Sequence, residues 1–202
     1  MIKQAPKSSH EIRSEIAQDS LNQQALSTLE LNSLELDNVF WQFSLKQWRN
    51  TKLQQTLLRC QDEQNLRINV LLLCIWLGLE KKPVHEHLDH ILKVSEPWHS
   101  QVVRPLRQVR KSLPSQSSLA ATQLKKQIQG SELQAEQIEQ AILYRSCSSL
   151  PHYEHTDLNT LDILTRNLSA SQLSNSDLLL LIQIILPTHP KSYILQSISA
   201  AK

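Results

Sequence analysis

The string HEHLDH, which begins at His85, is the one group in the chain with the residue types that bind metal ions. In a helix, Glu86 and His90 lie one turn apart, as do His87 and His90, so two donors could converge on one ion. The string misses the zincin pattern HExxH, because Asp89 stands where the second histidine should be. Without a third ligand the pattern favours a solvated polar helix face, and His85, His87 and His90 stay as the alternative metal-ligand candidates. No cofactor is predicted.

A second group is cationic and lies on a predicted helix over residues 98–113. Its basic side chains could contact phosphates, and an aromatic ring at the start of the helix could stack on a base. No aromatic residues alternate with the basic ones, and exposed basic sides of amphipathic helices are common, so an acidic protein is an equally good partner. The candidate binding residues are Trp98, Arg104, Arg107, Arg110 and Lys111, and Lys125 and Lys126 follow further along the chain.

Gln61, Asp62 and Asn69 form a polar group in an otherwise apolar part of the chain. If buried, each must find hydrogen-bond partners. They could line a polar pocket beside Trp41 and Trp76. The sequence favours a structural interpretation, in which Asp62 reaches the free amides at the start of the next helix and Asn69 ties the turn. No GxSxG elbow or local cysteine signature indicates nucleophilic catalysis.

The elements that must position these residues are predicted to be helical. The chain has only two glycines, which leaves few residues for hairpins or phosphate-binding loops. The segment 40–79 holds three of the four tryptophans and the longest apolar run, and its spacing predicts three short helices folded back into a hydrophobic centre. On the helix 98–113 the predicted inward stripe is Val102, Leu106, Val109 and Leu113, with Arg104, Arg107 and Lys111 on the opposite side.

The predicted fold is all-α: a single compact multi-helix bundle with a flexible N-terminal tail and an appended C-terminal helical pair. The tail is 1–36, the helical core domain 37–148 and the C-terminal extension 149–202. Whether the extension packs on the core is open, as is whether Gly130 splits the long helix. The predicted helices cover 39–49, 68–79, 84–94, 98–113, 119–145, 157–168 and 177–186. A further helix starts at residue 51 and ends at a loop over 63–67, and a last helix at 193–200 either forms or frays.

Composition and charge indicate a cytoplasmic protein. A net charge of +2 does not by itself attract nucleic acid or an acidic membrane. The three cysteines are an odd number without a CxxC motif, which indicates a reducing compartment. The N-terminal residues lack the apolar core of a secretory signal, and neither 70–79 nor 178–186 approaches the roughly 20 apolar residues that span a bilayer.

Several short strings together resemble a known family. They are FWQFSL from Phe40, LLRCQDEQNLRINVLLLCIWL from Leu57, Trp98, VVRPLRQVRK from Val102 and ELQAEQIEQ from Glu132. In this combination the chain resembles a family of small uncharacterised proteobacterial proteins, found in bacteria such as Pseudomonas and Vibrio and grouped under a domain of unknown function. The resemblance covers about residues 38–145, and it implies no activity.

The leading functional hypothesis is a non-enzymatic protein that acts by binding another protein or a second copy of itself. Its binding surface would be the long element 119–145 or the basic side of 98–113. The apolar heptad seam of 119–145 is incomplete, and such a seam often needs a second surface to cover it, from the protein's own core, a second copy or a partner. The alternatives are a nucleic-acid or ribosome-associated protein that uses the basic helix, and a metal-binding or enzymatic protein centred on His85 to His90.

Overall fold

The computed structural model describes residues 31–114, 118–148 and 158–201. Every regular element in these three ranges is a helix, and none of their residues is in a strand, so the all-α prediction is confirmed. The main helices are α2 (Val39–Gln47), α3 (Thr51–Gln64), α4 (Ile68–Leu79), α5 (Leu88–Trp98), α6 (Arg104–Ser112), α7 (Leu119–Ser148), α8 (Thr160–Ser169), α9 (Asn175–Ile185) and α10 (Lys191–Ala200). Short 3-10 turns, η1 (Leu31–Ser33) and η2 (His85–His87), precede α2 and α5. Of the predicted tail at 1–36, residues 1–30 lie outside the described residues, and η1 lies in the part that is described.

Asparagine side chains cap the first two main helices. Asn38 accepts a hydrogen bond from the amide of Trp41 at the start of α2. Asn50 accepts from the amides of Lys52 and Leu53, which starts α3. These caps satisfy amides that have no partner within their own helix. Asn65 then ends α3 with φ 55°, in the left-handed region that asparagine tolerates better than most residues.

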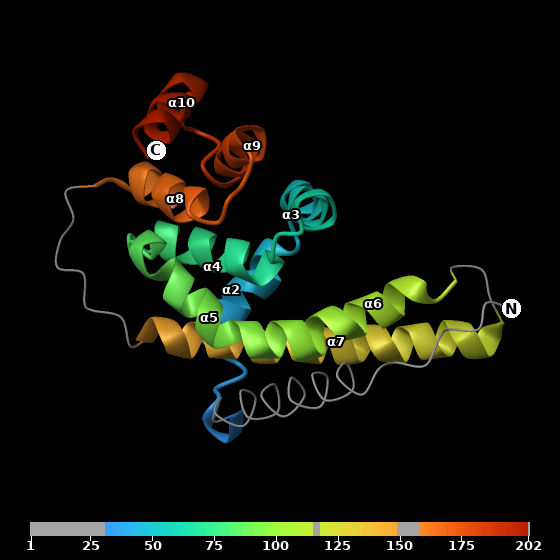
Figure 1. The fold of residues 1–202 in the computed structure, drawn as a ribbon. Coiled ribbons are helices and arrows are strands. Elements are labelled where there is room, and N and C mark those ends of the chain that lie inside the picture. The colour runs from blue at the N-terminus through green and yellow to red at the C-terminus, as the bar shows by residue number, and fades with distance from the viewer. Residues whose placement is uncertain (1–30, 115–117, 149–157, 202) are drawn as a thin grey trace, which may run out of the picture.

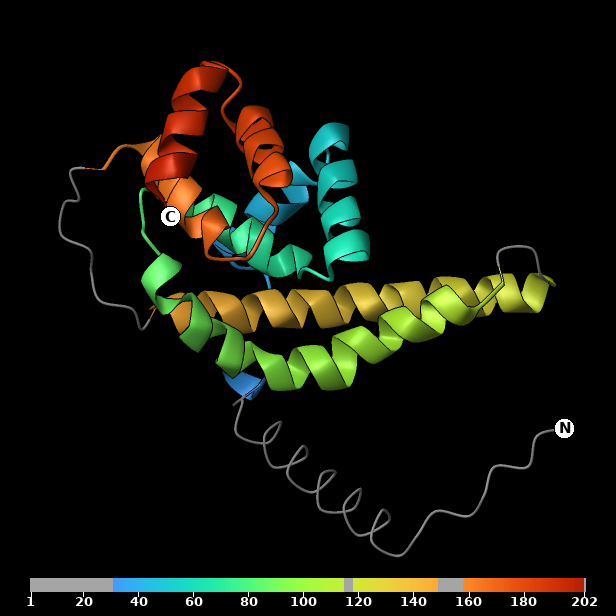
Figure 2. The same ribbon diagram turned by 45° about the horizontal axis from the view of Figure 1, so that its top comes forward.

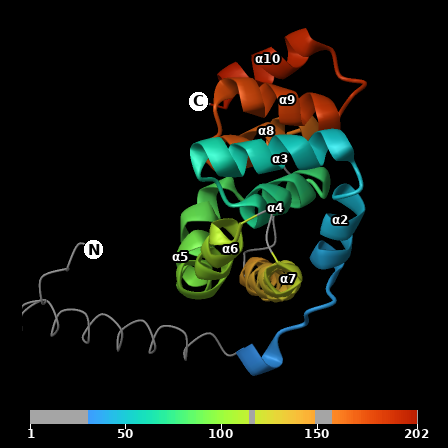
Figure 3. The same ribbon diagram turned by 90° about the vertical axis from the view of Figure 1, so that its right-hand side faces the viewer.

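Helix α4 is the centre of the molecule. Figure 3 shows α3 and α8 on one side of α4 and α7 on the other, with α2 at one end. The helix packs most extensively against α8 and also contacts α2, α3 and α7. This arrangement explains why its sequence is apolar on nearly all sides, as a helix surrounded by neighbours must be.

Residues C-terminal to α7 complete the same interior. Leu164 and Leu168 of α8, Leu181 of α9 and Ile194 of α10 belong to one buried cluster with the apolar residues of α4. The segment therefore packs on the core, which the sequence left open. It comprises three helices in place of the expected pair, because α10 forms over Lys191–Ala200. The division of the chain into a core domain and an extension at residue 149 stays a prediction.

The chain does not break at Pro97, where the sequence predicts that one helix ends and another begins. α5 includes Pro97 and runs through a π-helical turn, η3 (His99–Val103), directly into α6. Pro105 has no amide to donate, and the turn before it is widened so that the amide of Arg104 bonds to the carbonyl of His99, five residues back. The predicted break at Pro97 is therefore wrong, and the wider turn after it carries the helix on to Pro105.

Helices α6 and α7 form an antiparallel arm that projects from the body (Figures 1 and 2). Helix α7 is continuous from Leu119 to Ser148, so Gly130 does not split it. No side chain over 119–131 is buried, whereas the second half of the helix passes under the body and is largely buried. We call the part formed by α6 and residues 119–133 the arm.

Candidate functional site

The most elaborate polar site in the described residues surrounds Glu139 on α7. Its Oε1 atom accepts hydrogen bonds from Arg67 at 2.5 Å and from Nδ1 of His99 at 2.8 Å. Its Oε2 atom accepts from the side-chain amide of Asn69 at 2.5 Å. Arg67 and Asn69 come from the start of α4, and His99 comes from the π-helical turn η3. The site therefore joins three elements, and the Glu139 side chain is only 2% exposed.

Glu139 stays ionised in the interior. Burial alone would raise the pKa of the Glu139 carboxyl, but the hydrogen bond from His99, the charges of Arg67 and His99 and the hydrogen bond from Asn69 outweigh it and lower the pKa to about 2. A buried charge of this kind is tolerated only where donors surround it.

Further bonds extend the site on both sides. The Oδ1 atom of Asn69 accepts from Gln140 at 2.9 Å, and Arg67 donates to the hydroxyl of Ser95 at 2.8 Å. The indole of Trp98 donates to the carbonyl of Ala135 at 2.9 Å. Trp98 thus forms a hydrogen bond between α5 and the backbone of α7, which uses its indole nitrogen.

The predicted polar group of Gln61, Asp62 and Asn69 does not come together in the structure. Asn69 joins the Glu139 site, but Asp62 pairs with Lys111 at 2.6 Å, and Nε2 of Gln61 is buried with no hydrogen-bond partner among the described residues. The interpretation of Asp62 as a cap for the next helix is wrong, because Arg67 occupies that N-cap position without a side-chain cap.

The cationic residues of α6 are paired with carboxylates. Arg107 bonds to Glu132 at 2.9 Å and to Glu136 at 2.5 Å, and Arg110 also pairs with Glu132. Arg104 lies 3.6 Å from Glu96 across a more exposed contact. The predicted inward stripe on this helix is wrong at Val109, which is 47% exposed, while the Arg107 side chain is only 15% exposed. Acidic residues of α7 thus draw Arg107 and Arg110 inward, whereas the side chains of Arg104 and Lys111 stay about half exposed.

The two carboxylates that face α6 have opposite pKa shifts. Burial tends to raise the pKa of Glu132, but hydrogen bonds from Arg110 and Arg107 outweigh it and lower that pKa. For Glu136 burial is the largest effect and raises the pKa despite the charge of Arg107. The hydrogen bond to Glu132 raises the pKa of Arg110, so this ion pair stays charged at neutral pH.

The histidine string does not form the expected continuous helix. His85 to His87 make a 3-10 turn, and α5 begins only at Leu88. His85 lies 3.9 Å from Glu86, and its amide donates to Asn167 of α8. In the ranges that the structure describes, no cluster of three histidine, cysteine or acidic side chains could hold a metal ion.

The sequence interpretation missed Glu139, His99 and Arg67. A usable signal lay in α7, where Glu132, Glu136 and Glu139 recur at helical spacing and face one side of the helix. No pattern in the sequence shows that the start of α4 would reach the same point. Because Glu139 is enclosed and its oxygens are already bonded, the site can fasten three elements but does not present a reactive group to solvent.

The fold and this site define a class of protein: an all-helical protein fastened internally by a buried ionic network. More particularly, the chain belongs to the family described as a protein of unknown function (DUF2390), whose model matches residues 39–143. No curated protein and no solved structure matches the chain. None of the helices in the described ranges has the length and apolar character that a membrane span requires.

Proposed function

We propose that this is a non-enzymatic cytoplasmic bacterial protein that acts by binding another protein through the outer face of its arm. The observation that carries the proposal is the exposure of apolar side chains on a projecting element. Val109 is 47% exposed and Leu124 is 46% exposed, and no residue over 119–131 is buried. A projecting pair of helices with uncovered apolar residues is typical of a surface that another helix covers.

The helical repeat places these residues together. The contact of Arg107 with Glu132 in the arm, and that of His99 with Glu139 nearer the body, show which sides of the two antiparallel segments meet. Successive residues of a helix are rotated by about 100°, and the two helices run antiparallel. Starting from those contacts, one flank of each helix therefore lies on the side that faces away from α3 and α4. That flank, which we call the outer face, carries Leu106, Val109, Leu113, Leu124 and Ile128.

The outer face contains no charged side chain, so its partner must present an apolar helical surface. A second copy of the arm supplies one, since two identical uncharged faces can meet about a two-fold axis without repulsion. The nucleic-acid alternative receives less support, because Glu132 and Glu136 already neutralise Arg107 and Arg110. The three cysteines described are all free thiols, which supports a cytoplasmic location.

The test is sedimentation of the full-length protein over a range of concentrations. We expect a concentration-dependent dimer that Val109→Glu converts to a monomer, because a carboxylate in the apolar interface would lose its hydration. The matched control is Leu133→Glu. Leu133 is 52% exposed on the other side of α7, so this variant should dimerise as the wild type does.

A photo-crosslinking residue at position 113, compared with one at 133, extends the test to partners other than a second copy. A crosslinked protein seen only from position 113 in cells would support the proposal. A monomer at every concentration, together with no crosslink specific to position 113, would rule it out. Repeating the sedimentation with a chain that starts at residue 31 shows whether residues 1–30 compete for the outer face.

A further inference from the structure

The structure contains a second surface of different chemistry, between α3 and α9. A groove of about 570 Å³ runs between these helices. Its α9 wall is mainly apolar and includes Leu180, which is 37% exposed, together with Ile184 and Pro187, and Gln183 is its polar member. Its α3 wall is polar and includes Lys52 and Arg59. A volume of this size accommodates several side chains of a bound segment.

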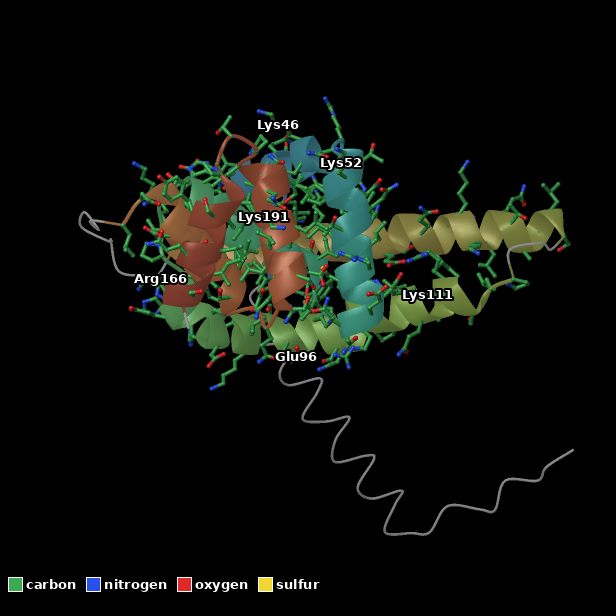
Figure 4. The ribbon with its side chains drawn as sticks, turned by 90° about the horizontal axis from the view of Figure 1, so that it is seen from above. Lys46, Lys52, Glu96, Lys111, Arg166 and Lys191 are labelled. Carbon is green, nitrogen blue, oxygen red and sulfur yellow. The ribbon has the colours of Figure 1, made fainter. Side chains whose placement is uncertain are left out.

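Basic residues outnumber acidic ones in the chain segments around the groove. Residues 38–61, which form α2 and most of α3, contain Lys46, Arg49, Lys52 and Arg59 and no acidic residue. Residues 178–201, which form most of α9 and all of α10, contain Lys191 and again no acidic residue. Figure 4 shows Lys46, Lys52 and Lys191 on the same face, around α3 and α9.

Two carboxylates offset part of this charge: Glu63 lies one turn beyond Arg59 on α3, and Asp177 is already committed. Asp177, at the start of α9, pairs with Arg59 and also accepts from Gln64 at 2.6 Å and from the hydroxyl of Ser174 at 2.7 Å. Its side chain is 8% exposed, whereas that of Arg59 is 44% exposed. Asp177 therefore holds the Arg59 guanidinium in place at the groove. Lys46, Arg49, Lys52 and Lys191 have no carboxylate partner in the described parts of the chain.

We propose that this groove binds an acidic amphipathic segment of another protein, with its apolar side chains against α9 and its carboxylates toward α3. The apolar wall favours a peptide over nucleic acid, because no aromatic side chain lines the groove to stack on a base. The unpaired lysines supply the complementary charge, which also speeds association. The outer face of the arm is uncharged, so the two surfaces select different partners.

The experiment selects peptides from a random 12-residue phage library on the immobilised full-length protein. We expect enriched peptides that combine aspartate or glutamate with leucine, isoleucine or phenylalanine. Their affinity, measured by fluorescence polarisation, should fall at least about tenfold in Lys52→Glu and in Leu180→Glu, and it should weaken as salt is raised. Both positions are exposed, and circular dichroism melting confirms that each variant is folded.

Matched controls separate the groove from the rest of the surface. Lys126→Glu on the arm and Leu195→Glu on α10 make the same changes at exposed positions outside the groove, and neither should alter peptide affinity. No enrichment, enrichment of basic peptides, or equal binding to the groove variants would overturn the proposal. So would binding of a labelled 20-nucleotide RNA that only Lys52→Glu abolishes, with no peptide selected. Val109→Glu should leave peptide binding intact, so this proposal and the arm proposal can fail separately.

Discussion

Glu139 shows how one residue can connect three helices and make the stability of the protein depend on pH. Its pKa of about 2 in the folded protein lies below the usual value of 4.5. The folded state therefore holds the carboxylate in its charged form more strongly than the unfolded chain does. That contribution is complete above about pH 4.5 and is lost as the pH falls toward 2, and its size is about 3 kcal/mol.

The first prediction is that Glu139→Gln lowers the free energy of unfolding by about 3 kcal/mol at pH 7. The amide keeps the shape of the side chain but leaves Arg67 and His99 without their countercharge. The loss should shrink as the pH is lowered from 4.5 toward 2, because the wild-type carboxylate then gains no further advantage from its partners. Urea unfolding at a series of pH values measures this difference.

Glu136→Gln is the control, because burial raises the pKa of Glu136. A raised carboxyl pKa favours the folded state at low pH and disfavours it as the pH rises, so the sign of the pH dependence should be opposite. A cost for Glu139→Gln that does not change between pH 7 and pH 3 would contradict the role assigned to its charge.

At the scale of elements, the contact between α4 and α8 depends on one glycine. A Cβ atom at Gly78 would lie 2.8 Å from the Cα of Leu164, and that backbone atom cannot move without moving α8. Gly130 on the arm is the opposite case, since nothing lies within 4 Å of the same added atom. The two glycines both lie inside helices and differ only in what surrounds them.

The second prediction uses that contrast. Gly78→Ala should destabilise the protein by about 1–3 kcal/mol, because the strain of overpacking exceeds the gain in helix propensity. Gly130→Ala should stabilise it by about 0.5–1 kcal/mol, since only the propensity changes. For a chain of this size the melting temperature should shift by about 2–4 °C per kcal/mol. If both substitutions stabilised the protein, the close approach of α4 and α8 would be wrong.

How far the sequence predicts these elements depends on the range of the interaction. The helices over 39–79 follow from a local signal, namely the spacing of their apolar residues. The orientation of α6 does not, because what turns Arg107 inward is a pair of glutamates about 25 residues later. The Glu139 site needs Arg67 and His99 to meet across the fold, and periodicity carries no information about that meeting. Where the sequence was right, the cause was local.

At the scale of the whole molecule, the segment that matches the family model is shorter than the segment that builds the hydrophobic interior. The match ends at residue 143, inside α7, whereas the buried cluster continues into α8, α9 and α10. Leu164 and Leu168 are fully buried against residues of α4 and its neighbours. A segment that supplies so much of one interior should unfold with it, since partial cores rarely hold a cooperative fold.

The last prediction tests this dependence with a chain that ends at residue 157 and so lacks α8, α9 and α10. Without α8, the apolar side of α4 is exposed to water, at a cost of about 25 cal/mol for each Å² of apolar surface. Because α4 buries so many leucines, the total cost exceeds the free energy of unfolding of an ordinary domain. We therefore expect near-ultraviolet circular dichroism and calorimetry to show no cooperative transition. Residues 158–202 added as a separate peptide should restore part of it. A shortened chain that unfolds cooperatively within about 1 kcal/mol of the full-length protein would instead show that the residues before the predicted boundary at 149 fold without the C-terminal helices.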